Sequence, residues 1–279
     1  MTISVNTNLF SLNAQRNLNK SQSSLSTSMQ RLSSGLRINS AADDAAGLAI
    51  SQRMNAQVRG MNVAVRNAND GISLAQTADG ALASVSDSLQ RMRELAVQSR
   101  NSTNSDSDKE SLDLEFKQLS SEIGRVLGGT TFNGKAILGA NAGTLTFQVG
   151  ANVTTNDSID ITTTDLTSDT KITTVTSASI GSASNASAIA TVITDIDSAI
   201  DDINSQRATF GASQNRFNSV VSNLQSSVEN QSAASSRITD ADFAAETANM
   251  SRAQILQQAG TAMVAQANQL PQSVLRLLQ

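Results

Sequence analysis

The 279-residue chain contains no His, Cys, Trp or Tyr, and only 3% of its residues are aromatic. This composition removes the side chain that titrates nearest neutral pH, the best thiol nucleophile and the usual zinc and iron–sulfur ligands. The net charge of −4, without a long basic run, argues against a nucleic-acid partner. No apolar stretch approaches the length needed to cross a bilayer, so membrane insertion is not expected either. We therefore expect a non-enzymatic protein with no cofactor and no metal site.

The first segment carries an apolar stripe in which leucines recur every seven residues, at Leu18, Leu25 and Leu32. After this stripe, Ser40 and Asp43 are spaced like a capping box, which predicts a break followed by a new helix from about residue 41. Residues 1–39 are therefore predicted to form an N-terminal helical arm.

The next helix is predicted from about residue 41 to about residue 100, without a proline. Its apolar residues alternate in steps of four and three, which is the seam of a coiled coil. The stripe shifts after Ala75, so we expect the helix to change packing partner there. The predicted seam residues are Met54, Val58, Met61, Val65, Ile72, Leu82 and Leu89.

A third helix is predicted to begin at Ser107, with Glu110 completing a capping box, and to end at the glycines of 128–129. Residues 40–129 would thus form the N-terminal part of a helical bundle. The segment 130–187 differs, because it is rich in Thr, Ser, Asn and Gly. Its Asn133-Gly134 pair predicts a tight β-hairpin, and the alternation at 145–149 and 159–161 predicts short strands. We expect this segment to be variable and surface-exposed.

The fourth helix, at about 188–236, has the cleanest four-three repeat, interrupted only at Arg207 and Gln214. Its length resembles that of the second helix, so we expect the two to lie antiparallel, with 188–239 completing the bundle. The predicted seam residues are Ile196, Ile200, Ile203, Phe210, Phe217, Val221 and Leu224.

A second break is predicted at 238–240, with Thr239 and Asp242 as cap residues, so residues 240–279 form a C-terminal helical arm. Neither arm can bury its apolar stripe alone, and we expect the arms to pair with each other and with further copies. The residues expected to pack in this arm are Leu256, Met263, Leu270, Val274 and Leu277. The fold class is therefore mainly α: a long antiparallel coiled-coil-like bundle with a small β-hairpin region and paired terminal arms.

Four blocks of sequence carry a resemblance to bacterial flagellins. They are LSSGLRINSAADDAAGLAIS at 32–51, QRMRELAVQ at 90–98, TFNG at 131–134 and AQANQLPQ at 265–272. The similarity extends over roughly residues 1–138 and 190–279, and four ordered blocks in a heptad frame are far more specific than any one of them alone.

The resemblance implies a structural subunit that polymerises into the extracellular flagellar filament used for swimming. The resemblance also implies export of the unprocessed chain through the flagellar type III apparatus, which accounts for an N-terminus without the basic and apolar regions of a signal peptide. The implied partners are copies of the chain itself, an export chaperone, and the cap and hook-junction proteins. With only 130–187 in the middle, we expect a short member with little outer domain.

The resemblance further implies that Arg91, Leu95 and Glu115 are recognised by Toll-like receptor 5 of a host. Packing between subunits is the alternative role for these residues, and the two roles are compatible. Asp43 and Asp44 could form a metal or acid–base pair, but their position favours binding at a helix N-terminus.

Three other functions were weighed against a filament subunit. A hook–filament junction protein would share similar terminal helices, whereas an intracellular coiled-coil scaffold would need neither the two broken arms nor the four blocks. An enzyme built on a carboxylate pair or a Ser–Lys pair is the least favoured, because no spacing in the sequence supports either arrangement.

Overall fold

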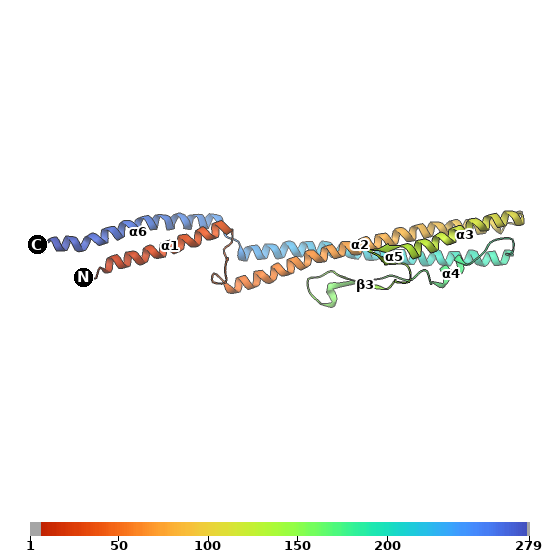
Figure 1. Cartoon of the computed structure of the whole chain (residues 1–279), viewed down its shortest axis with the longest axis horizontal. Coiled ribbons are helices and arrows are strands. Elements are labelled where there is room, and N and C mark those ends of the chain that lie inside the picture. The colour runs from red at the N-terminus through yellow and green to blue at the C-terminus, as the bar shows by residue number, and fades with distance from the viewer. Residues whose placement is uncertain (1–6, 278–279) are drawn as a thin grey trace. The chain divides into compact units, whose positions relative to one another are not determined.

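The computed structural model describes the backbone of residues 7–277 and the side chains of residues 7–269. The chain divides into a terminal unit, made of Met1–Ala56 and Asn230–Gln279, and a central unit, Gln57–Glu229. The long helices α2 (Ala45–Ser99) and α5 (Ala186–Thr239) each contribute to both units (Figure 1). The division thus falls inside these helices, and not at the predicted breaks near residues 39 and 240.

In the terminal unit, α1 (Leu9–Ser34) lies beside α6 (Phe243–Leu277) and runs antiparallel to it (Figure 1). The side chain of Asn8 caps α1 by accepting from the Ser11 N–H, and its Nδ2 donates to the Ala267 carbonyl at 2.7 Å. At the other end, Gly35 adopts φ 72° and its N–H bonds the Arg31 carbonyl. A glycine suits this position because it adopts the left-handed conformation without a Cβ penalty.

The two breaks that follow α1 and precede α6 pair with each other. Leu36 and Asp240 form an isolated antiparallel bridge, in which the Arg37 N–H donates to the Thr239 carbonyl at 2.7 Å. The Ala241 N–H donates to the Gly35 carbonyl at 2.9 Å. Backbone N–H and C=O groups of the two breaks, which would otherwise bond only to water, are therefore paired with each other.

Both breaks contain helix caps, as expected, but some of the capping residues differ from the predicted ones. Asp43 accepts from the backbone of Ser40 at 2.9 Å, which closes a turn, and Asp44 then caps α2 by accepting from the Gly47 N–H at 2.8 Å. The helix consequently begins at Ala45, so the predicted start near residue 41 was wrong. Asp242 caps α6, as predicted, but Thr239 is the last residue of α5.

In the central unit, α2 and α5 are antiparallel, as two ion pairs show. Arg93 on α2 bonds Asp197 at 2.6 Å, and Asp79, earlier on α2, bonds Arg207, later on α5, at 2.8 Å. The interruption of the seam at Arg207 is explained by its bond to Asp79. The third helix, α3 (Asp106–Gly129), begins after a capping box formed by Ser105 and Asp108, so the predicted box at 107–110 was wrong.

Most of the predicted seam lies in the core of the central unit. The fully buried members are Leu82, Leu89, Ile196, Ile203, Phe210 and Phe217, and Met61 and Leu224 form a second cluster. Val58, Val65, Ile72, Ile200 and Val221 are partly buried and pack against these clusters. Met54 is half-buried and belongs to the terminal unit.

Two small antiparallel sheets cover part of this core. Strands β1 (Thr131–Phe132) and β2 (Lys135–Ala136) form the predicted hairpin, whose turn residues Asn133 and Gly134 have φ of 49° and 78°. Both values suit a type I′ turn. Strands β3 (Thr144–Gln148) and β4 (Ser158–Thr162) pair Phe147 with Ile159, and a short 3-10 helix, η1 (Thr155–Asp157), precedes β4. The Phe147 ring meets Phe217 of α5 edge-on, with centroids 5.6 Å apart.

The segment 130–187 is more ordered and more buried than predicted. It contains a short helix, α4 (Thr170–Thr176), that the sequence analysis missed, and its apolar residues are anchored in the core. The fully or nearly buried residues between β2 and α5 include Ile137, Leu138, Leu166, Ile172, Val175 and Ile180. These apolar residues are spaced irregularly among Thr and Ser, so neither the helical nor the strand repeat of apolar residues predicted their burial.

Carboxylates of α3 hold the α4–α5 connection, residues 177–185. Asp113 is almost fully buried and accepts from the Ile180 N–H at 2.7 Å, the Ser179 hydroxyl at 2.9 Å and the Lys117 ammonium at 2.6 Å. Burial raises the pKa of Asp113, but these three donors outweigh it and leave the pKa below its usual value. Glu110 likewise accepts from the Ser182 hydroxyl and N–H, which lowers its pKa.

We predict that acid loosens this connection. A carboxylate whose pKa is lower in the folded state stabilises the fold above its unfolded pKa of about 3.9, and this stabilisation is lost as the pH falls through the folded pKa. Asp113→Asn should lower the melting temperature at pH 7 by roughly 3–10 °C, since each hydrogen bond to a charged group contributes about 1.5–3 kcal/mol. It should also flatten the fall in melting temperature towards pH 3.

The matched control is Asp87→Asn, which changes an exposed carboxylate on α2. Thermal melts of both variants and the parent chain from pH 7 to pH 3 provide the comparison. If Asp113→Asn kept the parent's pH profile, the connection would not depend on this carboxylate.

Candidate assembly and recognition surfaces

The contact between α1 and α6 is a narrow seam in which small side chains alternate with larger ones. Going along each helix, the residues that are not exposed recur in steps of three and four, the spacing of a coiled coil. On α1 they are Ser11, Ala14, Leu18, Ser21, Leu25, Ser28 and Leu32, joined by Arg31; on α6 they are Glu246, Met250, Ala253, Gln257, Gly260, Val264 and Ala267. Small residues allow the two backbones to approach closely, and a Cβ on Gly260 would lie 3.1 Å from Leu18.

The predicted arm-packing residues separate into two groups. Leu18, Leu25 and Leu32 lie in this seam, whereas Leu256 and Met263 do not and remain 50% and 62% exposed. The larger side chains of α6 were predicted to pack inside the arms, but Ala253, Gly260 and Ala267 face α1 in their place. Leu270, Val274 and Leu277 lie outside the residues whose side chains are described.

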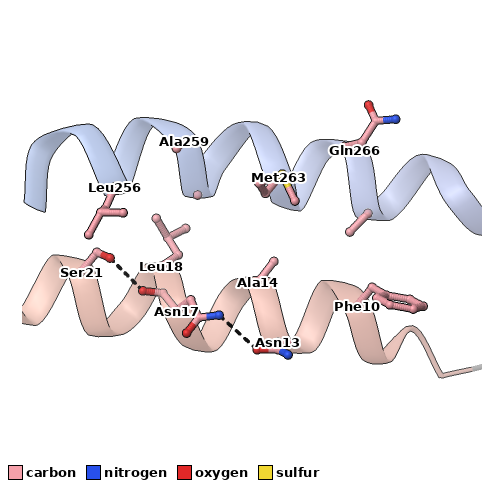
Figure 2. Close-up of a pocket in the computed structure, with 12 residues that line it drawn as sticks. Phe10, Asn13, Ala14, Asn17, Leu18, Ser21, Leu256, Ala259, Met263 and Gln266 are labelled. Atoms are coloured by element: carbon pink, nitrogen blue, oxygen red, sulfur yellow. Dashed lines mark hydrogen bonds between the residues drawn. The ribbon is translucent and has the colours of Figure 1, made fainter.

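Large apolar side chains consequently point outwards along both arms. The exposed ones are Leu9, Phe10, Leu12 and Met29 on α1 and Phe243, Ile255, Leu256 and Met263 on α6. Phe10, Leu256 and Met263 line a groove of about 440 Å³ between the helices, with Ala14 and Leu18 among its other lining residues (Figure 2). An apolar groove with exposed side chains such as these is a candidate site of association.

The surface around Arg91 is charged and hydrogen-bonded. The Arg91 guanidinium bonds Glu115 of α3 at 2.8 Å and Glu94 at 2.9 Å, and its side chain is 49% exposed. The hydrogen bond that Arg91 donates to Glu115, followed by the one that it donates to Glu94, raises the pKa of Arg91. The structure therefore brings together two of the three residues expected to meet a receptor, one from each helix.

Leu95, the third of these residues, is placed differently. Its side chain is only 1% exposed and belongs to the hydrophobic core of the central unit. Leu95 therefore does not present its side chain at the surface of this structure. The i, i+4 spacing from Arg91 suggested a common face, but the core face of α2 is wide enough here to include Leu95 together with Met92 and Ala96.

Asp43 and Asp44 act as backbone acceptors at a turn and a helix start, as described above. Hydrogen bonds from the Ser40 and Asn39 N–H groups lower the pKa of Asp43. Within the described residues, no cluster of three acidic side chains could hold a metal ion, and no helix is long and apolar enough to cross a membrane.

Two sequence comparisons agree with this architecture. The bacterial flagellin N-terminal helical region matches residues 5–143, and the bacterial flagellin C-terminal helical region matches residues 193–278. A flagellin of Halalkalibacterium halodurans is 46% identical over 274 residues, which are 98% of this chain and 99% of that protein. This chain belongs to the bacterial flagellin family.

The similarity to other flagellins covers only part of this chain, and in some cases only part of the other protein. A flagellin of Salmonella paratyphi A is 59% identical over 157 residues, 56% of this chain but 31% of its own length, so this chain spans about a third of that relative. The crystal structure of Bacillus cereus flagellin is 35% identical with a TM-score of 0.50, covering 57% of this chain and 88% of that one.

A putative flagellar hook-associated protein of Vibrio parahaemolyticus has a TM-score of 0.61 over 71% of this chain and all of that one. At 14% identity it shows a shared fold alone, so the identity to flagellins decides between the two alternatives. As a flagellin, the chain is a structural subunit of the extracellular flagellar filament and not an enzyme.

The burial of Leu95 leads to a prediction about stability. Leu95→Ala should lower the free energy of unfolding by about 2–5 kcal/mol, because it removes buried methyl groups and leaves a cavity. Val97→Ala is the matched control on the same helix, since Val97 is half-exposed and its truncation should change stability by less than about 0.5 kcal/mol. Urea unfolding of the full chain measures both, and equal stability of the two variants would show that Leu95 is not a core residue.

Proposed function

We propose that the outward-facing apolar residues of α1 and α6 are the surface through which copies of this flagellin contact one another in the filament. The supporting observation is that Ser, Ala and Gly occupy about half of the α1–α6 seam, while Phe10, Leu256 and Met263 remain exposed around one groove. A helical polymer requires contacts between two different surfaces of the subunit. Ile255, which does not line that groove, and Leu12 supply apolar surface elsewhere on the arms.

Polar substitutions in the groove should therefore prevent assembly without unfolding the subunit. Leu256→Gln combined with Met263→Gln should abolish filaments in a seeded polymerisation assay, because it places amides in an apolar contact where they lack partners. Both side chains are exposed in the single chain, so the melting temperature should stay near that of the parent. Thr261→Gln, at another exposed position of α6, is the control and should polymerise normally. Normal filaments from the double variant would refute the proposed contact surface.

Export and its partners form a second part of the proposal. The chain leaves the cell through the flagellar type III apparatus, as its family resemblance implies, and a chaperone covers the C-terminal arm beforehand. The exposed apolar side chains of α6, including Ile255 and Met263, give such a chaperone apolar surface to cover. The cap and hook-junction proteins are proposed as the partners at the two ends of the filament.

Recognition by Toll-like receptor 5 of a host is the third part. Arg91 and Glu115 match residues that the family resemblance associates with this receptor, and both side chains are half-exposed on neighbouring helices. The Arg91 guanidinium is already held by Glu115 and Glu94, so its orientation is fixed before a partner arrives, which reduces the entropy lost on binding. Leu95 contributes from beneath, by fixing the position of the helix.

The deciding variant is Arg91→Ala in the monomer. Loss of a hot-spot arginine should weaken receptor binding by about thirtyfold or more, with little change in melting temperature because the side chain is exposed. Arg93→Ala is the matched control: Arg93 lies two residues away, is equally exposed and is also ion-paired, but with Asp197 on α5. Affinity for the receptor ectodomain is measured for both variants. Equal affinity of Arg91→Ala and the parent would leave Arg91 with a packing role only.

A further inference from the structure

The α1–α6 seam repeats so regularly that its apolar contacts do not select one alignment of the helices. Leucine occupies the seam at 18, 25 and 32, while α6 presents a small residue every seven positions, at 253, 260 and 267. Sliding one helix by seven residues, about 10 Å, would place Leu18 against Ala253 in place of Gly260, and Glu246 opposite Ser24 within α1. The slipped seam would again pair a leucine with a small residue.

One contact between two charged side chains in the seam does not repeat. Glu246 is only 8% exposed, and its carboxylate lies 3.8 Å from an Nη of Arg31. Among the described residues, this is the one ion pair of the terminal unit. Seven residues to either side of Arg31 lie Ser24 and Ile38, neither of which carries a positive charge. A slip would therefore leave a buried carboxylate without its cation, which is a strongly unfavourable state.

We propose that Arg31 and Glu246 are the register-determining pair of the terminal arms. A buried polar contact is a known means of fixing the alignment of a coiled coil whose apolar positions are interchangeable. The placement of the charges supports this role, because Arg31 lies in the last turn of α1 and Glu246 in the first turn of α6. Each charge is thus also favoured by the dipole of its own helix.

The pair lies next to the backbone bridge between Leu36 and Asp240, which joins the two breaks. The bridge aligns the end of α1 with the start of α6, and the ion pair extends that alignment into the seam. The 3.8 Å between the Arg31 Nη and the Glu246 carboxylate is too long for a hydrogen bond, so the interaction is one of charge. A lysine at position 31 should consequently serve as well.

Disulfide cross-linking within one chain tests the proposal, since the chain has no cysteine of its own. Leu256→Cys is combined with Ser21→Cys, which lies across the groove from it (Figure 2), or with Cys at position 14 or 28, one heptad to either side. In the parent background only the 21–256 pair should close. With Glu246→Gln or Arg31→Gln, the 21–256 cross-link should fall and a 14–256 or 28–256 cross-link should form.

Two controls make the result specific. Arg252→Gln removes an arginine that lines the same side of the arms without bonding Glu246, and Arg31→Lys keeps the charge, so both should retain the 21–256 pattern. Variant chains are co-assembled with an excess of unmodified chains, and the cross-link within a chain is separated from links between chains by size on a non-reducing gel. An unchanged 21–256 pattern in Glu246→Gln and Arg31→Gln would overturn the proposal. That result would leave the proposed contacts between copies intact, because those are measured by polymerisation.

Discussion

Two helices can lie close together over many turns only if the side chains between them are small. In α1 and α6 serine, alanine or glycine meets this condition at about half of the seam positions, and Ser28 and Ala253 are among those that are buried. The small residues bring the backbones together, but they bury little apolar area, and the hydrophobic effect scales with that area. Several larger apolar residues, among them Leu256 and Met263, stay exposed, and it is there that we propose a further chain binds.

The central unit has the opposite distribution. Phe116, Phe210 and Phe217 are fully buried there, together with leucines and isoleucines from α2, α3 and α5. The segment between β2 and α5 adds to this core and is fixed by the polar contacts of Glu110 and Asp113. The two units therefore differ in what they bury. The central unit buries its large apolar residues within the chain, whereas the terminal unit leaves several of them exposed.

Periodicity predicted the helices well because a heptad repeat is a local property of the sequence. It located α1, α3, α5 and α6, the antiparallel pairing of α2 with α5 and the Asn133-Gly134 turn. It misplaced the starts of α2 and α3 because several Ser and Asp residues lie within a few positions of each other. Only the three-dimensional path of the chain determines which of them, such as Asp44 or Ser105, meets the free N–H groups.

Periodicity was a poorer guide to the residues that pack inside the arms, which depend on side-chain size, and to features that depend on contacts between distant residues. It assigned Leu256 and Met263 to the inside of the arms because it ranked residues by hydrophobicity, whereas close packing selects small ones. The signal was present in the heptad spacing of Ala253, Gly260 and Ala267. By contrast, α4 and the polar pair Arg31–Glu246 depend on residues far apart in the chain, which no local pattern reports.

The position of Leu95 has a consequence for the surface above it. One turn of α2 carries Arg91 on the outside and Met92 and Leu95 on the inside, so the backbone beneath the Arg91–Glu115 pair is fixed by the core. Substitutions that change the charge of this surface leave the core alone, whereas those that would tilt or shift the helix destabilise the whole unit. Any protein that reads this surface therefore meets a scaffold of constant shape, and sequence variation can alter its chemistry far more readily than its geometry.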